Sequence, residues 1–117
     1  MSLDKPPTVL VADDQADILH ALRVLLRGEG CKVKTVNTPD DALDSLAHDT
    51  FDVALIDLNY ARDTTSGKEG LDLIASIQKI DPDIPIVVMT AWATIDLAVE
   101  CMRKGAADFI QKPWENP

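Results

Sequence analysis

The stretch TVLVADDQAD, residues 8–17, decides the fold of this chain. It opens with a short, continuous apolar run, residues 9–12, and closes with two adjacent carboxylates, Asp13 and Asp14. A run of this kind is typical of a strand that is buried on both faces. Two like charges side by side repel each other, so the pair is unfavourable unless something binds it. The rest of the chain therefore has to bring a partner to this strand end.

Strand-like and helix-like patterns alternate along the remainder of the chain. After the first strand, residues 18–26 place apolar side chains at a period of 3.6, and Gly28 and Gly30 follow as a stop signal. Residues 32–36 alternate lysines with less polar residues, as in a strand at the edge of a sheet. The patterns predict three further strands at 53–57, 83–90 and 107–112, and three further helices at 38–47, 71–77 and 95–102.

Five strands separated by helices predict an α/β fold with a doubly wound parallel sheet. Right-handed crossovers place helices on both faces, and the expected strand order is 2-1-3-4-5 in chain numbering. Only four helices are predicted, whereas a helix after the fifth strand would complete the cover of one face. We therefore expect the final helix to be missing through truncation, leaving an incompletely covered apolar patch beside the first helix.

Length and charge restrict the class of protein. The chain has 117 residues, the size of one domain, and its net charge of −9 with only 11 Lys plus Arg argues against nucleic-acid binding. Cys31 and Cys101 match neither a metal-ligand spacing nor a disulfide scaffold and are read as reduced thiols. No leader and no apolar stretch of membrane-spanning length occurs in this sequence, so we expect a cytoplasmic protein with no membrane contact.

Polar residues end four of the five predicted strands. Since the carboxyl ends of parallel strands share one edge of the sheet, Asp13 and Asp14 should meet Asp57, Thr90 and Lys112 there. Three close carboxylates favour a hard divalent cation, and Mg²⁺ fits best because it prefers oxygen ligands and takes one or two protein carboxylates. Zinc is disfavoured, because no cysteine falls in the set and neither histidine of the chain is near these strand ends.

A carboxylate that is not needed for the metal can act as a nucleophile. Asp57 is the candidate, with Thr90 and Lys112 able to bind phosphoryl oxygens. A nucleotide-binding enzyme is excluded by chemistry, since no phosphate-cradling glycine loop follows the first strand. An aspartate-nucleophile phosphatase would need a second acid two residues after Asp57, and Asn59 stands there. The site is therefore interpreted as a phosphoryl acceptor.

Four motifs carry a resemblance to a known family: VADD at 11–14, LIDLN at 55–59, VVMTA at 87–91 and FIQKPW at 109–114. In this order and spacing, the chain resembles the receiver domain of bacterial response regulators over nearly its whole length. It is most similar to receivers of enhancer-binding transcription activators of the nitrogen-regulator type. The resemblance implies a flavodoxin-like fold.

The family's metal and phosphate chemistry maps onto named residues here. The resemblance implies that Asp13 and Asp14 bind Mg²⁺ together with Asp57 and the backbone carbonyl of Asn59. Asp57 would accept the phosphoryl group from a sensor histidine kinase or a phosphotransfer protein. The domain would then be no enzyme on separate substrates, since it catalyses only its own phosphorylation and dephosphorylation.

The family's switch residues also have counterparts. Thr90 and Lys112 would contact the phosphoryl group, and the aromatic Phe109 would turn inward as Thr90 moves. Here Phe109 lacks the hydroxyl of the tyrosine that is often found in the family. The connection from Tyr60 to Gly70 is longer than usual, and a solvated loop without a role is favoured over a lid or a kinase contact.

The resemblance also implies partners. Residues 1–117 would be a single receiver domain, the N-terminal part of a longer protein with ATPase and DNA-binding output domains. Whether the chain forms a homodimer is left open by the sequence. The alternative is a degenerate receiver that binds proteins without being phosphorylated. The presence of all five expected side chains disfavours it. The sequence does not identify the cognate kinase, the stimulus, the target genes or the phosphate lifetime.

Overall fold

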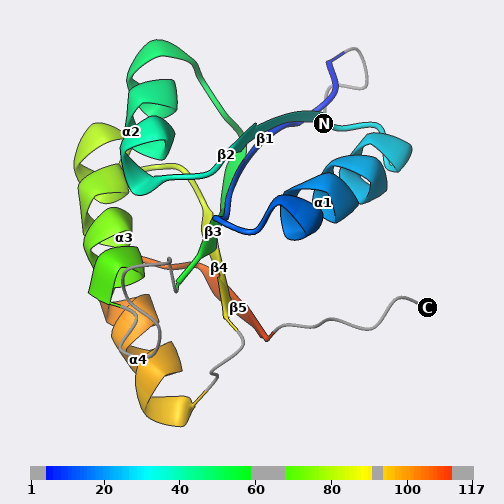
Figure 1. Ribbon diagram of the computed structural model, residues 1–117. Helices are drawn as coiled ribbons and strands as arrows, with labels where there is room; N and C mark the ends of the chain where they lie inside the picture. The colour runs from blue at the N-terminus through cyan, green and yellow to red at the C-terminus, as the bar shows by residue number, and fades with distance from the viewer. Residues whose placement is uncertain (1–4, 59–67, 91–93, 112–117) are drawn as a thin grey trace.

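Five parallel strands form a single sheet in the order β2-β1-β3-β4-β5. The structure is a computed structural model that describes residues 5–58, 68–90 and 94–111 (Figure 1). The predicted order is confirmed, and it is that of the flavodoxin-like doubly wound fold. The strands are β1 (Thr8–Ala12), β2 (Lys32–Val36), β3 (Val53–Asp57), β4 (Ile86–Thr90) and β5 (Asp108–Gln111).

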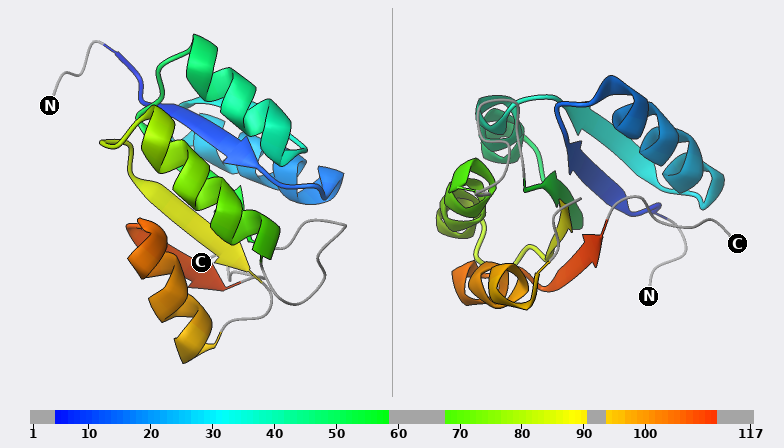
Figure 2. Two further views of the ribbon diagram at one scale, coloured as in Figure 1. Left: turned by 90° about the vertical axis from the view of Figure 1, so that its left-hand side faces the viewer. Right: turned by 60° about the horizontal axis from the view of Figure 1, so that its bottom comes forward.

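The helices cover the two faces of the sheet unequally. They are α1 (Ala16–Gly28), α2 (Pro39–His48), α3 (Lys68–Ile80) and α4 (Ile95–Lys104). Figures 1 and 2 show α1 on one face and the other three on the opposite face. None of the helices in the described part of the chain is long and apolar enough to cross a bilayer.

Local sequence signals set the ends of two helices. The Thr38 hydroxyl oxygen accepts a hydrogen bond from the Asp41 backbone N–H at 3.1 Å, and Pro39 occupies the first turn of α2. Thr94 caps α4 in the same way, and Gly105 ends that helix with a left-handed φ of 118°.

The fourth strand begins later than the sequence pattern predicted. We expected a strand over 83–90, but β4 starts at Ile86. The Asp83 backbone N–H donates to Asp81 Oδ1, which forms a turn, and Pro85 has no N–H to offer a sheet. Residues 83–85 therefore belong to the connection that precedes the strand.

The central strands are buried on both faces, which explains their continuous apolar runs. Leu10 and Ala12 of β1 face α2, α3 and α4, while Val9 and Val11 face α1. The larger core lies on the three-helix face and includes Leu10, Ile56, Leu73, Ile74, Ile77, Ile86 and Val88. Burying each such side chain contributes about 1.5–3 kcal/mol, so this face dominates the stability of the domain.

The α1 face is less completely covered. In β3, Ala54 and Ile56 on the three-helix face are fully buried, whereas Val53 and Leu55 on the α1 face are only half-buried. Ile110 of β5 is exposed. This asymmetry agrees with the expected apolar patch beside the first helix.

Candidate functional site

The acidic residues reach one edge of the sheet because β1 and β3 are neighbours in register. Ala12 pairs with Ile56, so Asp13 and Asp57 follow at the same level of adjacent strands. The Asp13 backbone N–H donates to the Val36 carbonyl at 3.1 Å, which ties the chain after β1 to β2. These main-chain contacts fix the backbone of Asp13 at the end of the sheet.

Three carboxylates meet at this edge. Asp13, Asp14 and Asp57 each offer an oxygen, and these oxygens lie within 4.8 Å of one another. Asp13 and Asp57 are buried, and Asp14 is the more exposed of the three. The Gln15 backbone N–H donates to Asp13 Oδ1 at 2.9 Å and stabilises that carboxylate. The prediction that the first strand delivers its acids to the end of the third is confirmed.

The donor set of this acidic cluster fits a hard divalent cation. Two unit charges about 4 Å apart repel by about 4 kcal/mol at an effective dielectric of about 20, before solvent screens the exposed member. A divalent ion replaces this repulsion with attraction. All three donors are carboxylate oxygens, the ligands that Mg²⁺ and Ca²⁺ prefer, and neither sulfur nor imidazole is among them.

Thr90 ends β4 beside this cluster. Asp57 pairs with Met89, so fully buried Thr90 comes one residue beyond that pair on the neighbouring strand. The Leu58 backbone N–H donates to the Met89 carbonyl at 2.8 Å, which keeps β3 and β4 joined past Asp57. Three of the predicted strand-end positions, at residues 13, 57 and 90, are therefore brought to one edge.

Phe109 lies on β5 within reach of this arrangement. It pairs with Val88, and Thr90 pairs with Gln111, so Phe109 and Thr90 project from the same face of the sheet. The Phe109 ring is half-buried against the larger core. Phe109 and Thr90 therefore lie on the same face of neighbouring strands, two register positions apart.

Two predicted site residues lie outside the described residues. They are Asn59, whose carbonyl was expected to bind the metal, and Lys112, which was expected to contact the phosphoryl group. Residues 60–67 of the long connection from Tyr60 to Gly70 also lie outside them. The roles assigned to these residues stay predictions.

Gly70 is a contributor to the site that the sequence patterns did not single out. A Cβ on Gly70 would lie 2.5 Å from the Leu58 Cα and closer still to the Leu58 carbonyl oxygen. The first turn of α3 therefore packs directly against the backbone of the residue after Asp57. The available signal was a glycine, a weak helix former, directly before the helix predicted at 71–77.

Comparison with known proteins agrees with this geometry. Residues 9–117 match the family model for the response regulator receiver domain. The transcriptional regulatory protein ZraR of Klebsiella oxytoca is 34% identical over 105 residues, which are 90% of this chain and 23% of that protein. The chain thus spans about a quarter of the length of that relative.

Two solved structures show the same fold. A response regulator protein from Burkholderia pseudomallei, crystallised with a phosphorylated aspartic acid, calcium ion and citrate, superimposes with a TM-score of 0.83 at 30% identity, covering 93% of this chain and 61% of that one. The beryllofluoride-activated NtrC4 receiver domain dimer superimposes with a TM-score of 0.82 at 30% identity, covering 92% and 85%.

Proposed function

The chain belongs to the response regulator receiver domain family, and we propose that it is a phosphorylation-controlled switch of a two-component system in which Asp57 accepts the phosphoryl group. The observation that carries this proposal is the meeting of Asp57 with Asp13 and Asp14 at the carboxyl edge of the sheet. The phosphorylated aspartic acid of the Burkholderia pseudomallei protein supports it by analogy.

We assign Asp13, Asp14 and Asp57 as ligands of a divalent cation, with the Asn59 carbonyl as a fourth. Mg²⁺ is the proposed ion, because all of these ligands offer oxygen, and water and a phosphoryl oxygen would complete its octahedral shell. When bound, the ion would neutralise the charge on the carboxylates and the phosphoryl oxygens. The calcium ion in the Burkholderia pseudomallei structure supports a hard divalent ion in general, and the choice of magnesium rests on the chemistry of phosphoryl transfer.

The proposed reaction transfers a phosphoryl group from the histidine of the kinase to Asp57. A carboxylate oxygen of Asp57 forms a bond to phosphorus while the phosphorus–nitrogen bond to the kinase histidine breaks. The bonding electrons pass to the imidazole, which takes up a proton. Thr90 and Lys112 bind the phosphoryl oxygens as this happens. Attack of water on phosphorus later releases inorganic phosphate and restores the Asp57 carboxylate.

We propose that the signal leaves through α4 and β5. Phosphorylation would draw Thr90 toward the phosphoryl group and turn Phe109 inward, which changes the neighbouring surface. Ile95, Val99 and Met102 form an exposed apolar stripe on α4, and the Ile95 side chain is 84% exposed. The stripe suits a second receiver or an output domain with ATPase and DNA-binding modules, and the NtrC4 receiver dimer supports the first of these. We also propose a cytoplasmic location, which suits this role.

Incubation with acetyl phosphate, followed by intact mass measurement, tests the proposal. We expect the mass to rise by one phosphoryl group with Mg²⁺ and not with EDTA. Asp57→Asn should show no gain, whereas Asp83→Asn, which alters an exposed acid outside the cluster, should behave as wild type. No gain in the wild-type chain, or a gain that persists in Asp57→Asn, would instead support a receiver that binds partners without phosphorylation.

A further inference from the structure

Strand β2 forms one edge of the sheet. It pairs with β1 on one side, and no strand of residues 5–58, 68–90 and 94–111 lies on its other side (Figure 2). The Lys32 backbone N–H donates to the Pro7 carbonyl at 2.8 Å and so points toward β1. Because successive residues of a strand point their main-chain groups in opposite directions, the N–H and C=O groups of Val33 and Thr35 point toward the open side. We refer to this open side as the β2 edge.

The side chains beside the β2 edge are largely cationic. Lys32 and Lys34 are exposed and lie two residues apart, so they share one face of the strand. Arg23 of α1 lies on the other face, where its guanidinium donates to the Thr35 hydroxyl oxygen. Lys34 also forms an ion pair with Asp49 at 3.7 Å, but both side chains are well exposed, and such a pair contributes little to stability.

This region differs in charge from the rest of the molecule. Residues 16–36, which contain α1 and β2, hold four Lys or Arg residues and two acids, whereas the whole chain carries a net charge of −9. A second copy of the chain is a poor partner for the β2 edge, because pairing β2 with β2 would bring lysines close to lysines. The charge of this region favours an acidic partner.

The row of main-chain groups requires a partner of a particular shape. Outward N–H and C=O groups at alternate residues match the main chain of another extended segment, whereas a small free anion would leave most of them unused. Lys32 and Lys34 on one face call for two acids that are also two residues apart in the partner. Val33, between them, packs against the smaller core under α1 and suits a β-branched residue beside it.

We infer that the β2 edge binds an extended acidic segment of a partner protein, which adds a strand to the sheet. Its main chain exchanges hydrogen bonds with Val33 and Thr35, and its acids at alternate positions lie beside Lys32 and Lys34. β1 separates this edge from β3, which carries Asp57. The interaction needs neither a phosphoryl group nor a metal ion, so it is independent of the function proposed for Asp57.

Amide hydrogen exchange in the presence of the peptide acetyl-Thr-Glu-Val-Glu-Thr-amide tests the inference. With the peptide at about ten times its Kd, exchange at Val33 and Thr35 should slow about tenfold. The Lys32 amide already donates to Pro7 and should change much less. Chemical shift changes near the lysines without slower exchange at Val33 and Thr35 would show ionic contact alone and overturn strand addition. Absence of binding would overturn the site.

Two altered peptides separate the main-chain and ionic contributions. Replacing both Glu residues by Gln removes the charge, and affinity should fall about two- to twentyfold. Methylating the internal amide nitrogens keeps the charge and removes the donors, so this peptide should not slow exchange at Val33 and Thr35. Equal affinity of the Gln peptide, or undiminished protection by the methylated one, would overturn the inference.

Variants of the chain place the contact. Lys32→Gln and Lys34→Gln should each weaken binding of the acidic peptide about two- to fivefold, the range for opposite charges on paired strands. Lys79→Gln makes the same change of charge at an exposed residue in the last turn of α3 and should leave affinity unchanged. An equal loss in Lys79→Gln would reduce the effect to net charge and overturn the β2 edge as the site.

Discussion

Asp13 is fully buried, and the carboxylates of Asp14 and Asp57 lie close to it, so these like charges repel one another and a bound cation would relieve that repulsion. Asp13→Asn keeps an oxygen that can accept from Gln15 and removes the charge. Without divalent ions, we expect the variant to melt several degrees above wild type, an effect of about 1–2 kcal/mol. The gain in melting temperature that Mg²⁺ gives wild type should be lost in the variant, since one proposed ligand is gone.

Melting temperatures measured in EDTA and in Mg²⁺ check both expectations for Asp13→Asn. The exposed Asp83 provides the control, and Asp83→Asn should respond to Mg²⁺ as wild type does. If Asp13→Asn melted below wild type by the same amount in both conditions, repulsion would not dominate the environment of Asp13.

The two cysteines should differ in reactivity. Burial raises the pKa of the fully buried Cys101 thiol, and the neighbouring Glu100 carboxylate raises it further. Since the thiolate is the reactive form, iodoacetamide at pH 8 should modify half-buried Cys31 well before Cys101. In Cys31→Ser, labelling of Cys101 should be slow in buffer and fast in denaturant. Equal labelling rates for the two thiols in the folded wild type would contradict the burial of Cys101.

The raised pKa of Cys101 also makes the free energy of unfolding depend on pH. A folded-state pKa above the unfolded value of about 8.5 means that the native state holds this proton more tightly. The stabilisation is fully present below about pH 8.5 and is lost as the pH rises through the raised pKa. The free energy of unfolding should therefore fall less steeply with alkaline pH in Cys101→Ala than in wild type.

At the scale of elements, the packing of α3 against β3 depends on Gly70. Gly70→Ala would place a Cβ 2.5 Å from the Leu58 Cα, so α3 has to move away from the residue that follows Asp57. We expect a loss of about 2–4 kcal/mol in the free energy of unfolding, together with slower phosphorylation of Asp57. Urea unfolding and the rate of mass gain with acetyl phosphate measure the two effects.

Gly28 offers a matched control for this prediction. It is the last residue of α1, and a Cβ added there would meet nothing within 4 Å. Gly28→Ala should be neutral or stabilise by up to about 1 kcal/mol, because alanine is the better helix former. A Gly70→Ala variant as stable as Gly28→Ala would show that α3 does not pack closely on Leu58.

Much of the order of strands and helices could be predicted from the sequence, because the spacing of apolar residues reflects which side chains are buried. Residues 9–12 form a doubly buried strand, as their continuous apolar run predicted, and Thr38 caps α2. The start of β4 was predicted wrongly, since apolar Ile84 resembled strand sequence although Pro85 lacks a donor. The contact between Gly70 and Leu58 could not be predicted, because it depends on how a helix approaches a strand rather than on a local pattern.

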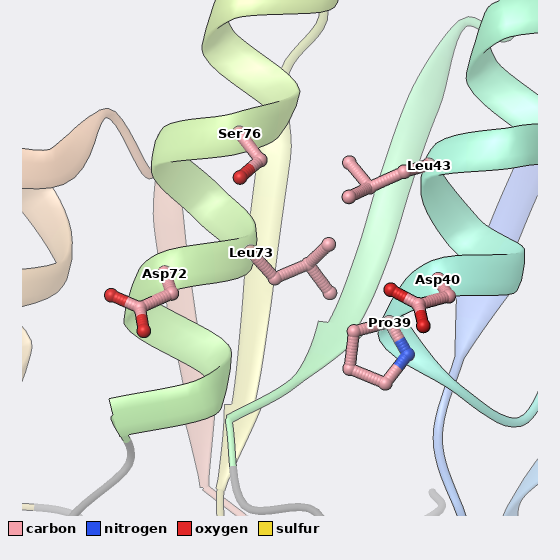
Figure 3. A pocket seen from close by; sticks show the side chains of 6 residues that line it. All are labelled: Pro39, Asp40, Leu43, Asp72, Leu73 and Ser76. Carbon is pink, nitrogen blue, oxygen red and sulfur yellow. The ribbon is translucent and has the colours of Figure 1, made fainter.

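At the scale of the whole molecule, the topology explains how distant residues form one site. The rule that parallel strands end at a common edge was enough to predict the meeting of Asp13 and Asp14 with Asp57, and to place Thr90 nearby. The separation of the carboxylate oxygens and the burial of Asp13 depend on strand register, which single-sequence patterns do not specify. The groove that Leu43 and Leu73 line between α2 and α3 (Figure 3) depends on side-chain packing between helices and was likewise beyond those patterns.

The central claim is that the sheet brings Asp57 into a metal-binding acidic cluster so that this carboxylate, and no other, is phosphorylated. Borohydride reduction after incubation with acetyl phosphate and Mg²⁺ tests it most directly, because an aspartyl phosphate is reduced to homoserine at the modified position. Peptide mass spectrometry should find homoserine at residue 57 alone, and only in samples that contained Mg²⁺. Homoserine at residue 13 or 14, or at no residue, would contradict the claim.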